Sequence, residues 1–74
     1  MNRNETQVAL AGLLLEKIRQ DRYPSATEMM LLEEILPPRL LPGYVEVLLD
    51  KVAEDDRPSI PMIRRIQRLI DAMP

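Results

Sequence analysis

The residues of this chain with the greatest capacity for chemistry are its carboxylates. Glu46, Asp50 and Glu54 are spaced four apart, which places them on one face of a helix. Asp55 and Asp56 follow directly. A calcium site needs about six to eight oxygen ligands from a looped segment with a glycine, and no such loop is present. A glycosidase pair would need a cleft, which nothing in the sequence indicates. We therefore expect these carboxylates to form a solvated face.

Nucleophilic catalysis is disfavoured by the residues that the chain lacks. It contains no Cys and no His, which excludes disulfide bonds, zinc sites of the usual kind and Cys- or His-based nucleophiles. Ser25 and Ser59 have no His to activate them and no glycine elbow. Each follows a proline and precedes an apolar segment, as helix-capping residues do. The sequence predicts no enzyme, no catalytic residue, no metal, no cofactor and no small-molecule substrate.

The remaining chemical feature is a basic cluster, Arg64, Arg65 and Arg68, near the C-terminus. A helix bearing three arginines can lie against a phosphate backbone. The acidic stretch 46–56 and the net charge of −2 oppose contact with nucleic acid. Nucleic-acid binding through this helix is therefore the alternative hypothesis for function.

Helical periodicity positions all of these residues. Apolar residues recur at intervals of three and four over four segments, about 5–20, 26–36, 43–54 and 60–72. The positions expected to face inward are Val8, Ala11, Leu14, Leu15, Ile18, Met29, Leu32, Ile35, Leu36, Val45, Leu48, Leu49, Val52, Ile63, Ile66, Ile70 and Met73. Residues 1–4 are predicted to be frayed. Gly12 inside the first helix is interpreted as a close helix–helix contact.

Two local patterns set the ends of the second helix. Ser25 and Glu28 fit a capping box, in which each residue hydrogen-bonds to the backbone of the other. In the second half Met62 replaces the glutamate, so only the serine of the box remains. Pro37 and Pro38 are expected to stop the second helix after Leu36.

The chain also resembles itself at an offset of 34 residues. Leu14-Leu15-Glu16-Lys17-Ile18 aligns with Leu48-Leu49-Asp50-Lys51-Val52, and Pro24-Ser25 aligns with Pro58-Ser59. Tetratricopeptide repeats share this period, but their aromatic, Gly, Tyr, Ala and Pro positions are not met in register, so no family is assigned. We predict an all-α fold, a small four-helix domain made of two similar αα-hairpins. The single domain 1–74 comprises hairpin one at 5–36, a Pro-rich connector at 37–43 and hairpin two at 44–73.

The repeat draws attention to positions where the halves differ. Met30 and Leu31 align with Arg64 and Arg65, and Glu34 aligns with Arg68. One interpretation is that Met30 and Leu31 lie deeper because the first helix covers them. The other interpretation is that Met30 and Leu31 form an exposed apolar patch, bordered by acidic residues, that binds a partner.

A core without Phe or Trp is small, and a partner can supply the missing burial. The leading hypothesis is a non-enzymatic helical protein–protein interaction module whose partner is another protein or a second copy. The candidate interface residues are Met30, Leu31, Glu34, Arg64, Arg65 and Arg68. The apolar run at 8–15 is too short to span a bilayer, so we expect no membrane association and a cytoplasmic location.

Overall fold

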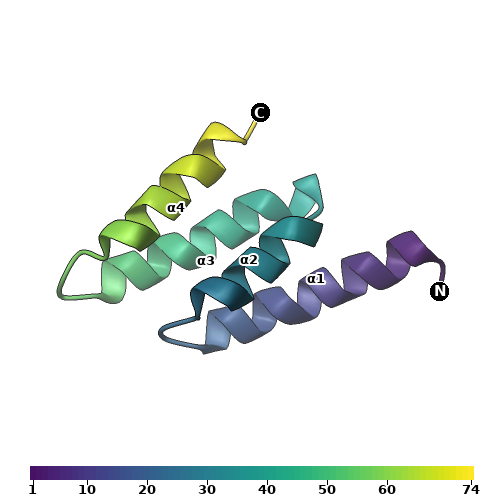
Figure 1. The fold of residues 1–74 in the computed structure, drawn as a ribbon, viewed down its shortest axis with the longest axis horizontal. Coiled ribbons are helices and arrows are strands. Elements are labelled where there is room, and N and C mark those ends of the chain that lie inside the picture. The colour runs from purple at the N-terminus through teal and green to yellow at the C-terminus, as the bar shows by residue number, and fades with distance from the viewer. The chain divides into compact units, whose positions relative to one another are not determined.

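The structure is a computed structural model that describes all 74 residues of the chain. It contains four α-helices, one short 3₁₀ helix and no strand. The helices are α1 (Arg3–Gln20), α2 (Ala26–Ile35), η1 (Pro38–Leu40), α3 (Leu41–Glu54) and α4 (Ile60–Asp71), as Figure 1 shows. The predicted all-α class with four helices is therefore confirmed.

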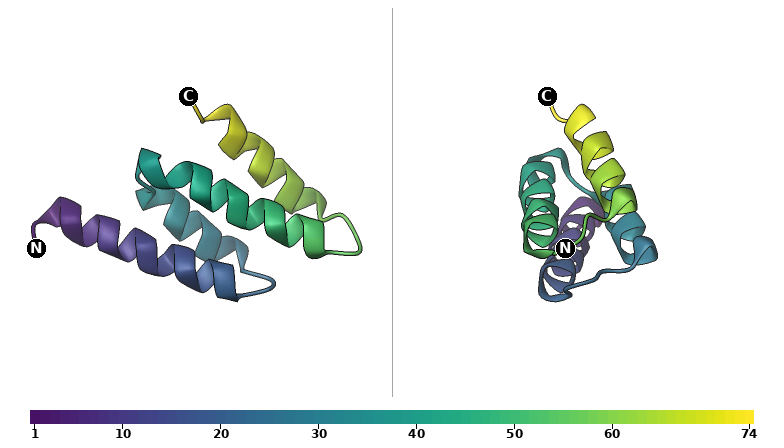
Figure 2. Two further views of the ribbon diagram at one scale, coloured as in Figure 1. Left: turned by 180° about the vertical axis from the view of Figure 1, so that it is seen from behind. Right: turned by 90° about the vertical axis from the view of Figure 1, so that its left-hand side faces the viewer.

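The chain divides into two compact units, Met1–Pro38 and Arg39–Pro74. The first unit pairs α1 with α2 and the second pairs α3 with α4. In each unit the two helices lie side by side and run in opposite directions, joined by a short turn (Figures 1 and 2). Each unit is thus an αα-hairpin, as the sequence predicts.

The first helix starts earlier than the sequence pattern suggests. α1 begins at Arg3 rather than Glu5, because Asn2 caps it. The Asn2 Oδ1 atom accepts a hydrogen bond from the Glu5 amide at 2.8 Å, and Asn2 Nδ2 donates to Glu5 Oε1 at 3.1 Å. The first of these bonds satisfies a backbone donor that the first turn of a helix otherwise leaves free. The segment predicted to be frayed therefore contains the N-cap of α1.

In the first hairpin, Ala11 and Ile18 of α1 are buried, and so are Met29 and Leu32 of α2. These residues lie three or seven positions apart along each helix, so they form one stripe per helix, as the periodicity predicts. α1 has 18 residues and α2 has 10, which makes α1 about 12 Å longer at 1.5 Å per residue. The beginning of α1 therefore extends beyond the helix that pairs with it (Figure 1).

Proline chemistry sets the end of α2 and the start of α3. α2 ends at Ile35, one residue earlier than predicted, and Leu36 is extended. The following Pro37 disfavours helical geometry at Leu36. α3 begins at Leu41, inside the segment predicted as connector, because Pro42 lies in the first turn, where no amide donor is required.

The second hairpin buries residues that the predicted stripe misses. Tyr44, Val45, Val47 and Leu48 of α3 are buried, whereas Leu49, predicted to face inward, is about half exposed. Tyr44 and Val47 flank the predicted stripe on the side away from Leu49. The inward face of α3 is therefore rotated about its axis relative to the prediction.

α4 shows the same kind of difference. Ile66 is buried, but Ile63 and Ile70 are 39% and 45% exposed, so the prediction that they face inward is wrong. Met62, Leu69 and Met73 are less exposed than these two isoleucines. The apolar arc of α4 is wider than the surface that one neighbouring helix covers, and its Ile63–Ile70 edge is left outside.

The two glycines are not sites of close packing. A methyl group added at Gly12 would meet no atom within 4 Å, and the same holds at Gly43. The interpretation of Gly12 as a helix–helix contact is therefore wrong. Gly12 lies on the exposed side of α1, where the missing side chain has no packing role.

The turns of the two hairpins share their spacing. α1 ends at Gln20 and α3 at Glu54, and the capping serines are Ser25 and Ser59, in both cases 34 residues apart. Burial does not follow the same offset throughout, because Leu13 is exposed while Val47 is buried. The internal repeat, like the single-domain organisation, stays a prediction.

Candidate interaction surfaces

The serines proposed as caps act as caps. Ser25 Oγ accepts a hydrogen bond from the Glu28 amide at 3.0 Å, and Ser59 Oγ accepts one from the Met62 amide at 3.4 Å. Both oxygens are therefore committed to helix N-termini, which confirms the prediction from sequence. The longer bond lies in the second hairpin, where Met62 stands in place of the capping-box glutamate.

The carboxylate stripe of α3 lies in solvent. Glu46, Asp50 and Glu54 are all exposed, as predicted. No group of three or more His, Cys, Asp or Glu side chains is gathered closely enough to hold a metal ion. The stripe therefore forms the solvated face of α3.

The outer face of α2 carries the apolar candidates. Met30 and Leu31 are 50% and 48% exposed, while Met29 and Leu32 on the opposite side are buried. Glu34 is exposed one turn further along the same face. Met30 and Leu31 are therefore exposed rather than covered, whereas their binding of a partner stays a prediction. We call Met30, Leu31 and Glu34 the α2 face.

The charged residues of α2 are all acidic. The helix contains Glu28, Glu33 and Glu34 and neither Lys nor Arg. Glu28 and Glu33 are partly buried at the edges of the helix, whereas Glu34 is fully on the surface. The α2 face is therefore an apolar pair followed by a carboxylate, on a helix that carries no basic residue.

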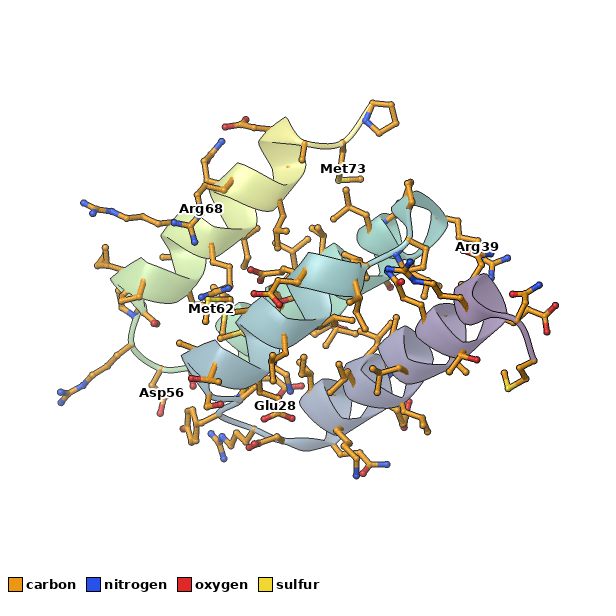
Figure 3. The ribbon with its side chains drawn as sticks, turned by 45° about the vertical axis from the view of Figure 1, so that its right-hand side comes forward. Glu28, Arg39, Asp56, Met62, Arg68 and Met73 are labelled. Atoms are coloured by element: carbon orange, nitrogen blue, oxygen red, sulfur yellow. The ribbon has the colours of Figure 1, made fainter.

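The outer face of α4 has a different composition. Arg64 and Arg68 are exposed and lie one helical turn apart, and Figure 3 labels Arg68 on this helix. Neither forms an ion pair or a hydrogen bond with another side chain. Arg65 is partly buried and already makes an interaction of its own, so it stands apart from the other two.

Exposed apolar residues lie next to the arginines of α4. The sequence patterns placed Ile63 in the core and assigned no position to Ile60. Ile60 is 54% exposed at the start of α4, and Ile63 lies one turn later beside Arg64. We call Ile60, Ile63, Arg64 and Arg68 the α4 face. It combines exposed aliphatic side chains with two free positive charges.

Two further surface features of the first hairpin lie outside the sequence-based candidates. The first is Tyr23 in the turn between α1 and α2. It is 66% exposed, its amide donates to Asp21 Oδ1 at 3.0 Å, and the Arg22 guanidinium lies 5.4 Å from the centre of its ring. The other tyrosine of the chain, Tyr44, is buried. Tyr23 was missed because turn residues carry no periodic signal.

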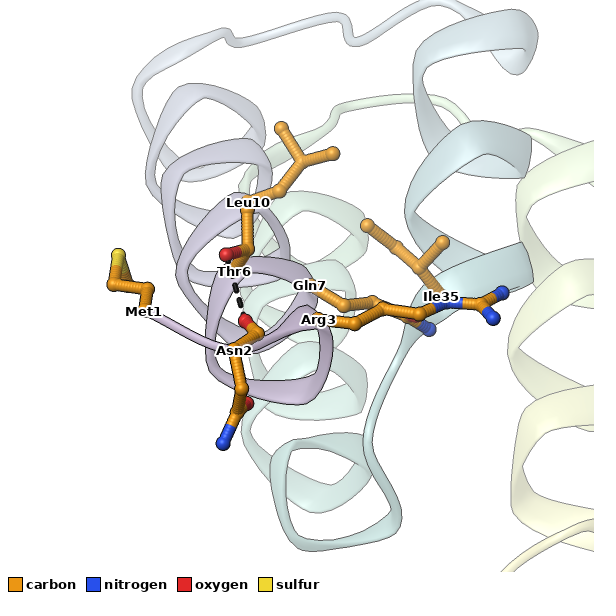
Figure 4. Close-up of a pocket in the computed structure, with 7 residues that line it drawn as sticks. All are labelled: Met1, Asn2, Arg3, Thr6, Gln7, Leu10 and Ile35. Atoms are coloured by element: carbon orange, nitrogen blue, oxygen red, sulfur yellow. Dashed lines mark hydrogen bonds between the residues drawn. The ribbon is translucent and has the colours of Figure 1, made fainter.

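The second is a shallow depression of about 490 Å³ at the N-terminal end of α1 (Figure 4). Leu10 of α1 and Ile35 of α2 supply its apolar wall, and Arg3 is the one charged side chain in it. The Thr6 hydroxyl is bonded to the Asn2 carbonyl at 2.8 Å. No acid–base pair lines the depression, so its chemistry is that of an open apolar surface.

No helix has the length and apolar content that crossing a membrane requires. Comparison with protein-family models, with curated proteins and with solved structures gives no match for this chain.

Proposed function

We propose that this chain is a non-enzymatic protein–protein interaction module that binds its partner through exposed apolar side chains on the outer faces of α2 and α4, and that it acts in the cytoplasm. The observation that carries the proposal is the exposure of Met30 and Leu31. These two adjacent, large apolar side chains are about half exposed on a helix with an N-terminal cap. Exposed apolar side chains that lie together are typical of interaction sites.

The chemistry of the α2 face supports this proposal. Methionine is flexible and polarisable, so it adapts to the shape of a partner surface. Glu34 at the edge of the apolar pair can select a partner by charge, since rim charges steer encounter and disfavour like-charged surfaces. A protein whose core is small and contains no Phe or Trp also gains relatively more stability when a partner buries its apolar surface.

The experiment compares wild type with Met30→Asp/Leu31→Asp in affinity capture from a cell extract, with the retained proteins quantified. The control is Leu10→Asp/Leu13→Asp, which makes the same chemical change at two exposed leucines of α1. We expect retained proteins to be lost with the α2 variant and kept with the α1 variant. Unchanged capture by a folded Met30→Asp/Leu31→Asp variant would remove the α2 face from the proposal.

A second candidate function is nucleic-acid binding through α4, which is favoured by the exposure of Arg64 and Arg68 one turn apart. Cationic side chains at that spacing can contact successive phosphates. It predicts retention on a duplex DNA column at low salt, with binding that weakens steeply as salt rises. Arg64→Ala/Arg68→Ala should abolish that retention, and wild type passing through unretained would contradict this candidate.

A further inference from the structure

We propose that the partner of the α2 face is the α4 face of a second copy of this chain. The inference rests on the proposed function and names the partner that it leaves open. It would place Met30 and Leu31 of one copy against Ile60 and Ile63 of another, with Glu34 near Arg64 and Arg68.

The first support is charge. α2 contains three glutamates and no basic residue, and α4 contains three arginines and one aspartate. An α2–α2 or α4–α4 contact would bring like charges together, whereas an α2–α4 contact pairs opposite charges. Since Glu34, Arg64 and Arg68 are exposed, their charges are available to another molecule.

The second support is the order of residues along each helix. On the α2 face the apolar pair comes first and Glu34 follows one turn later. On the α4 face Ile60 and Ile63 come first, and Arg64 and Arg68 follow one and five residues after Ile63. The order of apolar and charged residues is therefore the same on both helices, so a parallel alignment can bring apolar residues together first and acid against base after them.

The third support is the apolar surface that each face leaves in solvent. Ile63 is exposed because α4 carries a wider apolar arc than its hairpin covers, and Met30 and Leu31 lie opposite the buried side of α2. Covering both at once removes aliphatic surface from water on both molecules. One helix-on-helix contact is at the small end of protein interfaces, so the association is expected to be weak and to depend on concentration.

The test is sedimentation equilibrium over a wide range of protein concentrations. It uses wild type, Glu34→Arg, Arg68→Glu, an equimolar mixture of these two variants, and Glu46→Arg as a control. The control reverses an exposed charge on α3, outside both faces. Circular dichroism checks that each variant keeps its helix content.

We expect wild type and Glu46→Arg to self-associate at high concentration. Each single reversal on a face should raise the dissociation constant by about three- to tenfold, since it converts an attraction between partly exposed charges into a repulsion. The mixture should regain wild-type association, because Arg at position 34 of one variant then meets Glu at position 68 of the other.

Several outcomes would overturn the inference. A monomeric wild type at every concentration excludes the second copy, and association unaffected by either reversal places the contact elsewhere. The mixture could associate as weakly as each variant alone, while the double variant Glu34→Arg/Arg68→Glu recovers helix stability that the single variants lose. That result would show that the two charges pair within one molecule and not between two. A monomeric wild type that still captures other proteins through Met30 and Leu31 would overturn this inference and leave the proposed function standing.

Discussion

Met29 and Met30 are adjacent in the sequence and lie on different faces of α2, with 5% of the first side chain exposed and 50% of the second. Successive residues of a helix are rotated by about 100°. A methionine therefore packs in the hairpin interior at position 29, and the next methionine lies on the surface. This pair gives a matched test of the structure, because the chemical change is identical at both positions.

Met29→Ala should lower the free energy of unfolding by about 2–5 kcal/mol, the usual cost of truncating a buried methionine. Met30→Ala should change it by less than about 0.5 kcal/mol, as surface substitutions do. Urea unfolding followed by circular dichroism measures both. Equal losses at the two positions would show that the orientation of α2 is incorrect.

The orientation of α4 is tested by removing one methyl group at a time. Ile66→Val should cost about 0.5–1.5 kcal/mol because Ile66 is buried, whereas Ile63→Val should be close to neutral. The helix propensity change is the same at both positions and cancels in the comparison. A larger loss at Ile63 would restore the inward stripe that the sequence predicts.

Removal of the helix caps should have graded effects. Ser25→Ala is expected to lower stability by about 1 kcal/mol, because the Glu28 amide loses its acceptor. Ser59→Ala should cost less, since its bond to the Met62 amide is 3.4 Å rather than 3.0 Å. Thr27→Ala, at an exposed non-capping position of α2, serves as the control. The prediction fails if the Ser59 substitution is the more damaging one in thermal or urea unfolding.

Gly12→Ala should stabilise the protein by up to about 1 kcal/mol. The new methyl group meets no atom within 4 Å, and alanine restricts the unfolded chain while it favours the helix. A rise in the melting temperature measured by circular dichroism would agree with this expectation. A fall would indicate that something packs closely on α1 at this position.

The features recovered from the sequence are those encoded by local chemistry. Ser25, Ser59 and the proline pair at 37–38 set helix ends through bonds and steric effects that involve only neighbouring residues. The same kind of signal exists at Asn2 and Glu5, which form a capping pair three residues apart, but it lies before the first apolar residue of the periodic pattern and was missed.

The rotation of each helix about its own axis was harder to predict from the sequence. α4 has apolar side chains at Met62, Ile63, Ile66, Leu69 and Ile70, and Met73 follows it, so two overlapping stripes satisfy helical spacing equally well. Only the packing against α3 decides between them. The sequence left the exposure of Met30 and Leu31 undecided for the same reason. Residue spacing also does not reveal that Arg65 is partly buried whereas Arg64 and Arg68 are exposed.

The unequal lengths of α1 and α2 have a consequence for backbone dynamics. The amides of the overhanging turns, around Thr6 to Val8, can open by unwinding of the helix end alone, without disturbing the hairpin interior. Those near Ile18, whose side chain is fully buried, can open only when the pair of helices separates. Deuterium should therefore enter α1 as a gradient that slows from its beginning to its end.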